Sequence, residues 1–153
     1  MEDYQITQLS NGLRLAYKYH PSKISHCGFI IDAGSRNETE EISGIAHFLE
    51  HMLFKGTKKK KALQILNRLE GVGAEMNAYT AKEKTCIYAS FSDEYFNRAL
   101  ELLTDITFFS IFPEKEILKE KKVIHEEIDM YDDNPEEFVI DKIQELIFPN
   151  HPL

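Results

Sequence analysis

The feature that most constrains the fold of this chain is a pair of histidines, His47 and His51, that lie four residues apart inside the apolar stretch GIAHFLEHMLF. Residues four apart on an α-helix project from one face, one turn from each other, so both imidazoles can reach a single metal ion. Most neighbouring positions are apolar, which predicts a largely buried helix, and buried imidazoles need partners. The stretch is therefore predicted to be a helix that carries two metal ligands.

Glu50 precedes His51 and completes an HxxEH pattern. On a helix, its carboxylate lies to the side of the two rings, where it can take a proton from a water molecule during metal-assisted hydrolysis. The pattern inverts HExxH and is a signature of zinc peptidases. Histidines four apart also occur by accident on the surfaces of amphipathic helices, so the pattern alone leaves an ordinary surface helix as the alternative.

A catalytic zinc ion takes three protein ligands and a water molecule, so a third ligand must come from elsewhere in the fold. At about 100° per residue in a helix, Glu120 and Glu127 share one flank of the segment 113–133, whereas Glu126 points away from its core. Glu127 is therefore the candidate third ligand. The alternative is that both flank glutamates face solvent, as most helix glutamates do. The segment is predicted to be helical from its apolar stripe of Ile117, Ile124, Ile128 and Tyr131.

Three segments, HFLEHMLFKGT, GAEMNAYTAKEKT and the acidic helix with Glu127, together resemble the N-terminal domain of the pitrilysin, insulysin and mitochondrial processing peptidase family of inverted-zincin metallopeptidases. The resemblance runs from NGLRL near the start to NHPL at the end. It implies that Zn²⁺ is held by His47, His51 and Glu127. It also implies catalytic roles for Glu50, as the general base, and for Glu120, as an auxiliary group that supports the site.

The resemblance further implies a substrate-binding strand. In the family this strand carries an Asn-Ala pair, matched by Asn77 and Ala78 in NAYT, and a phenylalanine matched by Phe54 lines the cleft. An exposed edge strand that includes Tyr79 would let an extended peptide add on through main-chain hydrogen bonds. Without the resemblance, Asn77 is typical of a turn, and the two aromatic residues are typical of a core.

The remaining sequence predicts strands and helices in a mixed order. Residues 4–19 are predicted to form a hairpin around an Asn-Gly turn, and strands are predicted at 26–33, 74–80 and 85–92. Ser43 is the predicted N-cap of the motif helix, and a further helix is predicted to begin at Ser92 and Asp93 and to stop at Pro113. That helix carries Leu102, Leu103, Ile106 and Phe109. A helix is also predicted before the strand 74–80, and it carries Ala62, Ile65, Leu66 and Leu69.

Asn134 and Pro135 are predicted to begin a last helix. Its apolar stripe is predicted to face the core and consists of Val139, Ile140, Ile143, Leu146 and Ile147. Paired strands with helices between and after them predict an α+β fold, a two-layer sandwich of a mostly antiparallel sheet packed against helices. This is the half-domain that the resemblance implies.

Composition sets the broad limits. A chain of 153 residues that is 42% hydrophobic is long enough for one domain with its own core, and the net charge of -8 argues against a nucleic-acid partner. No secretory signal and no apolar run long enough to cross a bilayer is evident, so we expect no membrane association and a cytoplasmic location. Cys27 and Cys86 fall in predicted strands and are expected to be reduced thiols.

Members of the resembled family build the working peptidase from two similar halves, in one chain or in paired subunits. We therefore expect residues 1–153 to be a single zinc-binding N-terminal domain, a fragment that lacks the homologous C-terminal half. Its partners would be a second homologous domain or subunit and a peptide or unfolded protein substrate. The isolated chain is expected to bind zinc and to hydrolyse peptides poorly.

A zinc metalloendopeptidase is the function that these observations favour, and two alternatives remain. S-ribosylhomocysteine lyase is a short metalloenzyme with an HxxEH helix, but it uses a downstream cysteine as its third ligand, and no cysteine follows Cys86 here. A non-catalytic structural subunit of the same family is the second alternative. Such subunits usually lose the zinc-binding residues, and this chain keeps them.

Overall fold

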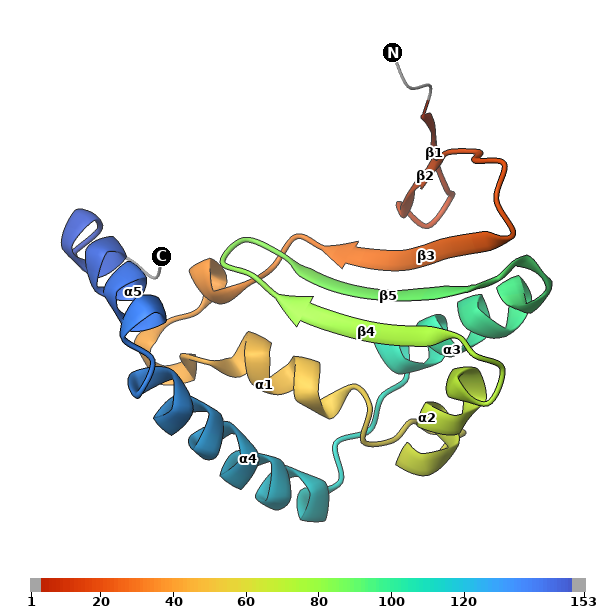
Figure 1. Cartoon of the computed structure of the whole chain (residues 1–153). Helices are drawn as coiled ribbons and strands as arrows, with labels where there is room; N and C mark the ends of the chain where they lie inside the picture. Colours follow the sequence, from red (N-terminus) through yellow and green to blue (C-terminus); the bar gives the residue numbers. More distant parts are fainter. Residues whose placement is uncertain (1–3, 150–153) are drawn as a thin grey trace.

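Residues 4–149 are described by a computed structural model of the chain, in which a sheet is covered on one face by helices (Figure 1). The sheet contains β3 (Ile24–Ile31), β5 (Thr85–Ser92) and β4 (Glu75–Thr80), in that spatial order, and both pairings are antiparallel. This arrangement confirms the predicted α+β fold. Residues 150–153, with which the resemblance ends, lie outside the described residues.

Three helices contact the sheet: α1 (Ile45–Met52), α2 (Ala62–Glu70) and α3 (Phe96–Phe108). The long helix α4 (Glu114–Asp132) packs on α1 from the side away from the sheet, so α1 lies between the sheet and α4 (Figure 1). The last helix, α5 (Pro135–Ile147), follows α4 and contacts it. No helix in this described part of the chain combines the length and the apolar character needed to cross a bilayer.

The core lies between the sheet and α2 and α3. Side chains alternate between the faces of a strand, so Ile87, Ala89 and Phe91 of β5 point to the helices and are buried, whereas Tyr88 points to the opposite face. Full burial of a large apolar side chain such as Ile87 or Phe91 contributes about 1.5–3 kcal/mol to folding. The core cluster consists of Leu53, Ile65, Leu69, Ala74, Ala78, Ile87, Ala89, Phe91, Ala99, Leu102, Leu103 and Ile106.

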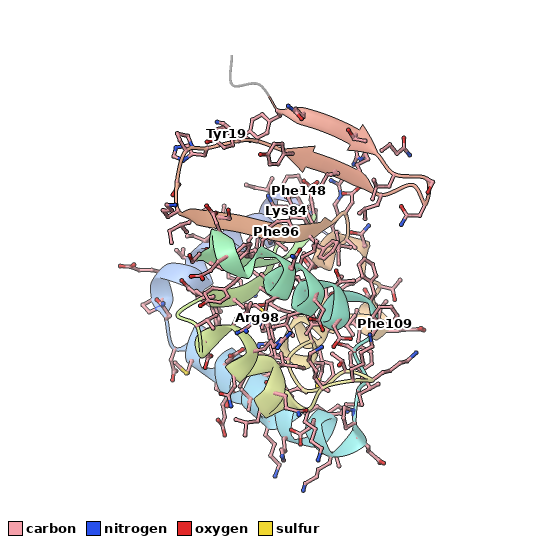
Figure 2. The ribbon with its side chains drawn as sticks, turned by 90° about the vertical axis from the view of Figure 1, so that its right-hand side faces the viewer. Tyr19, Lys84, Phe96, Arg98, Phe109 and Phe148 are labelled. Carbon is pink, nitrogen blue, oxygen red and sulfur yellow. The ribbon has the colours of Figure 1, made fainter. Side chains whose placement is uncertain are left out.

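The predicted N-terminal hairpin is confirmed, with strands β1 (Gln5–Gln8) and β2 (Arg14–Tyr17) paired antiparallel. The turn uses Gly12 at φ +89°, a conformation that glycine adopts without strain. Every residue of both strands is exposed, and the hairpin stands apart from the three-stranded sheet (Figure 2). Tyr19, labelled in that view, lies in the connection that leads to β3.

The cysteines lie on adjacent strands and are both free. Cys27 packs against the core cluster, but Cys86 alternates with the buried Ile87 and therefore points to the opposite face of the sheet. Burial raises the pKa of the Cys27 thiol.

The prediction that α5 faces the core is wrong. Its start is as predicted, because the Asn134 side chain accepts a hydrogen bond from the backbone N–H of Glu136 and Pro135 follows the cap. The helix then leads away from the helical layer (Figure 1). Periodicity identifies an apolar face, but it does not tell which surface covers that face. The five residues of the predicted core stripe are 49–81% exposed: Val139, Ile140, Ile143, Leu146 and Ile147.

Two predictions about the motif helix are also corrected. Its N-cap is Gly44 at φ +85°, and Ser43 instead ends a short 3-10 turn. The carboxylate of Glu38 accepts hydrogen bonds from the backbone N–H groups of Gly44 and Ala46, both at 2.7 Å, and so replaces the serine cap from six residues upstream. The helix is also only partly buried, because the sheet and α4 cover two of its sides while Leu49 is exposed.

Smaller corrections concern element ends. β3 begins two residues earlier than predicted and ends at Ile31. α3 follows a 3-10 turn at Asp93–Tyr95 and ends at Phe108, and Pro113 is instead the N-cap of α4. Three residues of the predicted apolar stripes are exposed, namely Leu66, Ile128 and Tyr131. Phe109, beyond the end of α3, is exposed at the side of the domain (Figure 2).

Candidate metal centre

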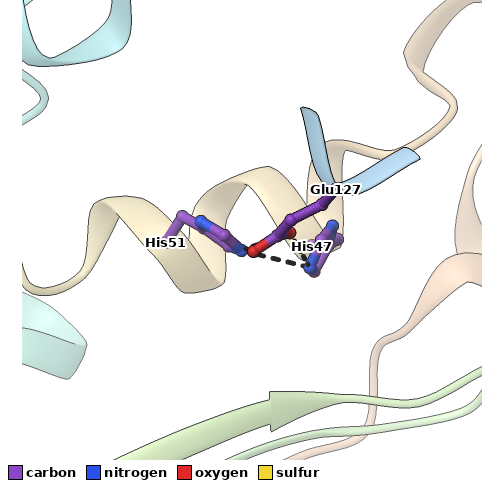
Figure 3. A group of neighbouring side chains, drawn as sticks. All are labelled: His47, His51 and Glu127. Carbon is purple, nitrogen blue, oxygen red and sulfur yellow. Dashed lines mark hydrogen bonds and ion pairs between the residues drawn. The ribbon is translucent and has the colours of Figure 1, made fainter. Parts of the chain in front are cut away.

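Three side chains from α1 and α4 meet at one point. The Nε2 atoms of His47 and His51 are 3.1 Å apart, and Oε2 of Glu127 lies 3.7 Å from the first and 3.4 Å from the second (Figure 3). Ligand atoms that surround a zinc ion tetrahedrally at about 2.0–2.1 Å lie about 3.3 Å from one another. The three separations therefore match three corners of one zinc coordination sphere.

The helical register explains why these residues meet. His47 and His51 are separated by one turn of α1, and their rings are roughly perpendicular, at 82°. On α4, Glu127 points toward α1 and is half-buried, whereas its neighbour Glu126 is exposed. The prediction that Glu127, and not Glu126, faces inward is confirmed, because one residue along a helix rotates the side chain by about 100°.

Glu120 contacts His51 and lies on the same flank of α4 as Glu127, about two turns before it. Its Oε1 accepts a hydrogen bond from Nδ1 of His51 at 3.0 Å, and its Oε2 lies 2.6 Å from Nζ of Lys55. A histidine that donates from Nδ1 keeps an unprotonated Nε2 in its neutral form, and that nitrogen is the one directed at Glu127 and His47. Glu120 therefore sets the tautomer that a metal ligand requires.

The charge state of Glu120 follows from its neighbours. Burial by itself would raise the pKa of this carboxyl, but hydrogen bonds from Lys55 and His51, together with their charges, outweigh burial and hold the pKa below its usual range. The carboxylate is therefore ionised at neutral pH, and both of its oxygens act only as acceptors, one for the His51 N–H and one for Lys55.

Glu50 lies one residue before His51 on α1 and is half-buried. Within residues 4–149, its carboxylate makes no hydrogen bond or ion pair, so it is not tied to a structural partner. A half-buried carboxylate one residue from His51 and without a partner among the described residues is available for proton transfer.

The donor set fits a zinc ion. Two imidazole nitrogens and one carboxylate oxygen, all within 4.8 Å of one another, are the ligand types that zinc binds in catalytic sites. Three protein ligands leave a fourth position for water or substrate. The remaining imidazole nitrogen of His51 is bonded to a carboxylate, which is the usual support of a zinc-binding histidine.

The predicted substrate strand is an edge strand in the described part of the chain, because β4 pairs only with β5. The N–H of Ala78 donates to the Asn77 side chain at 2.8 Å instead of to β5, so it points to the open edge. The Ala78 methyl group is buried, while Asn77 and Tyr79 belong to the face away from α1. What this strand offers beside α1 is therefore its backbone.

Phe54 follows the motif helix and is half-buried against the core cluster. This contact agrees with the alternative interpretation of Phe54 as part of the core. A role for Phe54 in a substrate cleft stays a prediction.

Sequence reasoning missed two residues that support the centre. Lys55 follows His51 by four positions, which would place both on one helix face, and this spacing was the available signal. Glu38 gave no such signal, because it acts on the N-terminus of α1 from outside the window in which helix caps are sought.

Comparison with known proteins agrees with this geometry. The family model described as Insulinase (Peptidase family M16) matches residues 14–153. An uncharacterized zinc protease of Bacillus subtilis is 46% identical over 144 residues, which are 94% of this chain and 35% of that protein. The mitochondrial-processing peptidase subunit beta of Rattus norvegicus is 44% identical over 151 residues, which are 97% of this chain and 30% of that protein.

A solved structure is similar as well. The crystal structure of a protease from Helicobacter pylori matches with a TM-score of 0.85 at 29% sequence identity, over 90% of this chain and 34% of that one. The chain thus spans about a third of the length of these relatives. None of them is described as a lyase, and the third donor beside the two histidines is Glu127 and not a cysteine, so the lyase alternative is not favoured.

Proposed function

Because this chain belongs to the insulinase family of peptidases, we propose that it is the metal-bearing part of a zinc metalloendopeptidase. One observation carries the proposal: two nitrogens of α1 and one carboxylate oxygen of α4 converge at separations that suit a single zinc ion. A non-catalytic subunit would have no need for this convergence.

The chain's own residues divide the chemistry among them. A bound zinc ion supplies Lewis acidity that makes water a nucleophile near neutral pH and polarises the scissile carbonyl. Glu50 takes a proton from the attacking water molecule while the oxygen of that water bonds to the carbonyl carbon. Glu50 then gives the proton to the amide nitrogen as the C–N bond breaks, so that a carboxylic acid and an amine are released. Glu120 holds the ring of His51 throughout.

The open edge of β4 is the proposed binding site for an extended peptide. A peptide strand that pairs there replaces the Asn77 side chain as the acceptor for the Ala78 N–H. The pairing then uses backbone groups alone. Backbone pairing depends little on sequence, which suits peptides and unfolded proteins as substrates. Side-chain preference would come from Tyr79, Phe54 and surfaces outside this chain.

The working enzyme needs, in this proposal, a second homologous domain or subunit. The relatives are about three times as long as the matched region, and one is described as a subunit of a processing peptidase. Cytoplasmic location stays a prediction from the sequence.

Metal analysis tests the proposal directly. The chain is purified, dialysed against zinc, and its metal content is measured for the wild type, Glu127→Gln and Glu126→Gln. We expect about one zinc ion per chain in the wild type and in Glu126→Gln, because Glu126 is exposed and points away, and a loss in Glu127→Gln. A wild-type chain without zinc, or loss in Glu126→Gln alone, would contradict the proposed centre.

A further inference from the structure

Lys55 reaches the metal centre through one intermediary. Its ammonium nitrogen lies 2.6 Å from Oε2 of Glu120, and the other oxygen of the same carboxylate accepts from Nδ1 of His51 at 3.0 Å. The two oxygens of Glu120 are therefore divided between a cation on one side and an imidazole on the other. The result is a continuous hydrogen-bonded row, Lys55 to Glu120 to His51, that ends at the candidate metal ligand.

The row is largely shielded from water. The side chain of Glu120 is 8% exposed, that of His51 is 16% exposed and that of Lys55 is 27% exposed. A carboxylate this buried needs an opposite charge. Among the described residues, the ammonium group of Lys55 supplies it. Lys55 therefore balances the charge that keeps Glu120 available to His51.

The backbone around Lys55 is held on both sides. Its N–H donates to the carbonyl of Met52 at the end of α1. Beyond it, Thr57 pairs with Ser110 and donates its hydroxyl to the buried Asp105 at 2.8 Å. The turn that presents Lys55 to α4 is thus fixed by α1 on one side and by α3 and the segment after it on the other, so the ammonium is preorganised at the carboxylate.

We propose that Lys55 is a positioning residue for the metal centre: it holds the Glu120 carboxylate, which in turn fixes the orientation and the Nδ1–H tautomer of His51. This inference rests on the proposed function, because the direction of the His51 Nε2 atom matters only if that nitrogen binds a metal. Lys55 itself touches neither the metal nor the substrate.

Zinc affinity is the first readout, measured by competition with a chromogenic chelator. Lys55→Met keeps the aliphatic stem and removes the charge, and we expect zinc binding to weaken roughly tenfold, at the lower end of the effect of groups that support a zinc-binding histidine. Lys55→Arg restores most of the affinity. Lys119→Met is the matched control, because Lys119 precedes Glu120 on α4 but is exposed and pairs with Glu116 instead.

The second readout separates positioning from general stability. Nitrogen-15 NMR of the metal-free protein distinguishes the two tautomers of His51. We expect the Nδ1–H form in the wild type and in Lys119→Met, and a shift toward the Nε2–H form in Lys55→Met. In a Glu120→Gln background, Lys55→Met should change zinc affinity no further, because its effect passes through Glu120.

The possible outcomes decide between the two proposals. A wild type that binds no zinc overturns the proposed function, while the tautomer measurement still tests Lys55. Wild-type affinity and tautomer in Lys55→Met overturn the role of Lys55 and leave the zinc centre intact. An equal loss of affinity with and without Glu120 also overturns it. Should Lys55→Met not fold, the wild type alone decides: a Lys55 ammonium held by Glu120 gives a resolved, slowly exchanging proton–nitrogen signal, and a rapidly exchanging one contradicts the proposal.

Discussion

His47 and His51 present their Nε2 atoms to each other at 3.1 Å, although the rings belong to one helix and need not converge. Because Nδ1 of His51 donates to Glu120, its Nε2 carries a lone pair in the neutral ring. Nε2 of His47 and Oε2 of Glu127 face the same point. A cation between such donors would stabilise the folded chain, so we expect folding and metal binding to be coupled.

Zinc should accordingly stabilise the folded chain. A ligand that binds the native state at a free concentration of 100 times its Kd adds about 2.7 kcal/mol to the free energy of unfolding. Thermal unfolding with zinc and with an excess of chelator measures this difference. The double variant His47→Gln/His51→Gln is the control and should show equal melting temperatures in both conditions, and an equal response of this variant and the wild type would show that zinc acts elsewhere.

Substitution of the proposed base should separate metal binding from hydrolysis. Glu50→Gln removes the proton acceptor but no ligand, so zinc content should stay near that of the wild type while peptide hydrolysis falls by a factor of about 10²–10⁴. Hydrolysis of a fluorogenic peptide and metal analysis of the same sample give both values. Loss of zinc in Glu50→Gln would assign Glu50 to the coordination of the metal instead.

The isolated chain should hydrolyse peptides poorly even with zinc bound, because the relatives that it matches are about three times as long as the matched region. The assay compares the 153-residue chain with and without Glu50→Gln, so that contaminating peptidases are recognised by their indifference to the substitution. Robust hydrolysis that disappears in Glu50→Gln would show that no second half is needed.

Loss of the unusual cap on α1 should destabilise the helix that carries both histidines. In Glu38→Ala the backbone N–H groups of Gly44 and Ala46 lose their acceptor, and we expect a decrease in the free energy of unfolding of about 0.5–2 kcal/mol, as for other helix caps. Denaturant unfolding measures it. Glu41→Ala is the control, since Glu41 is exposed on the neighbouring 3-10 turn, and equal effects of the two substitutions would contradict a capping role.

Ion pairs that join α3 to α2 and to the turn before α2 predict how stability depends on pH. Hydrogen bonds from Lys60 and Arg68 lower the pKa of Glu101. Burial alone would lower the pKa of Lys60, but its hydrogen bonds to Glu101 and Asp105 outweigh burial and raise it. A carboxyl pKa that is lowered by folding stabilises the fold at pH values above the ordinary pKa. That contribution is lost as the pH falls through the lower pKa of the folded state. An ammonium pKa that is raised by folding stabilises the fold at pH values below the ordinary pKa. That contribution is lost as the pH rises through the higher pKa of the folded state.

The acid side of this dependence is open to measurement. Glu101→Gln should flatten the decline in unfolding free energy below about pH 4.5, the ordinary pKa of the group, relative to the wild type. Glu94→Gln serves as the control, because Glu94 is exposed and makes no ion pair within residues 4–149. An unchanged acid limb in Glu101→Gln would show that the pair contributes nothing to stability.

Much of the candidate site could be predicted from the sequence. The spacing of His47 and His51 places both rings on one face of any helix, and the seven-residue spacing of Glu120 and Glu127 does the same on α4. The hairpin turn and the strands β4 and β5 follow equally from local pattern. These features follow from residue patterns that are local in the chain.

Contacts between distant segments could not be predicted in this way. The Asn77 and Ala78 pair was expected on an edge strand, but only the pairing of β4 with β5 alone shows that Ala78 directs its N–H to that edge. The core face expected for α5 failed for the same reason. An apolar stripe records that a helix has something to bury, and the partner that buries it is fixed by the rest of the fold.

The sequence by itself thus determined which side chains share a helix face, because helical periodicity needs only neighbours along the chain. The tertiary structure alone decided that α4 crosses α1 at the height of His47 and His51, which brings Glu127 to their nitrogens and Glu120 between His51 and Lys55. Residues of two helices meet only when packing fixes how far one helix is shifted along the other. That packing arises from the burial of apolar surface between the sheet and the helices.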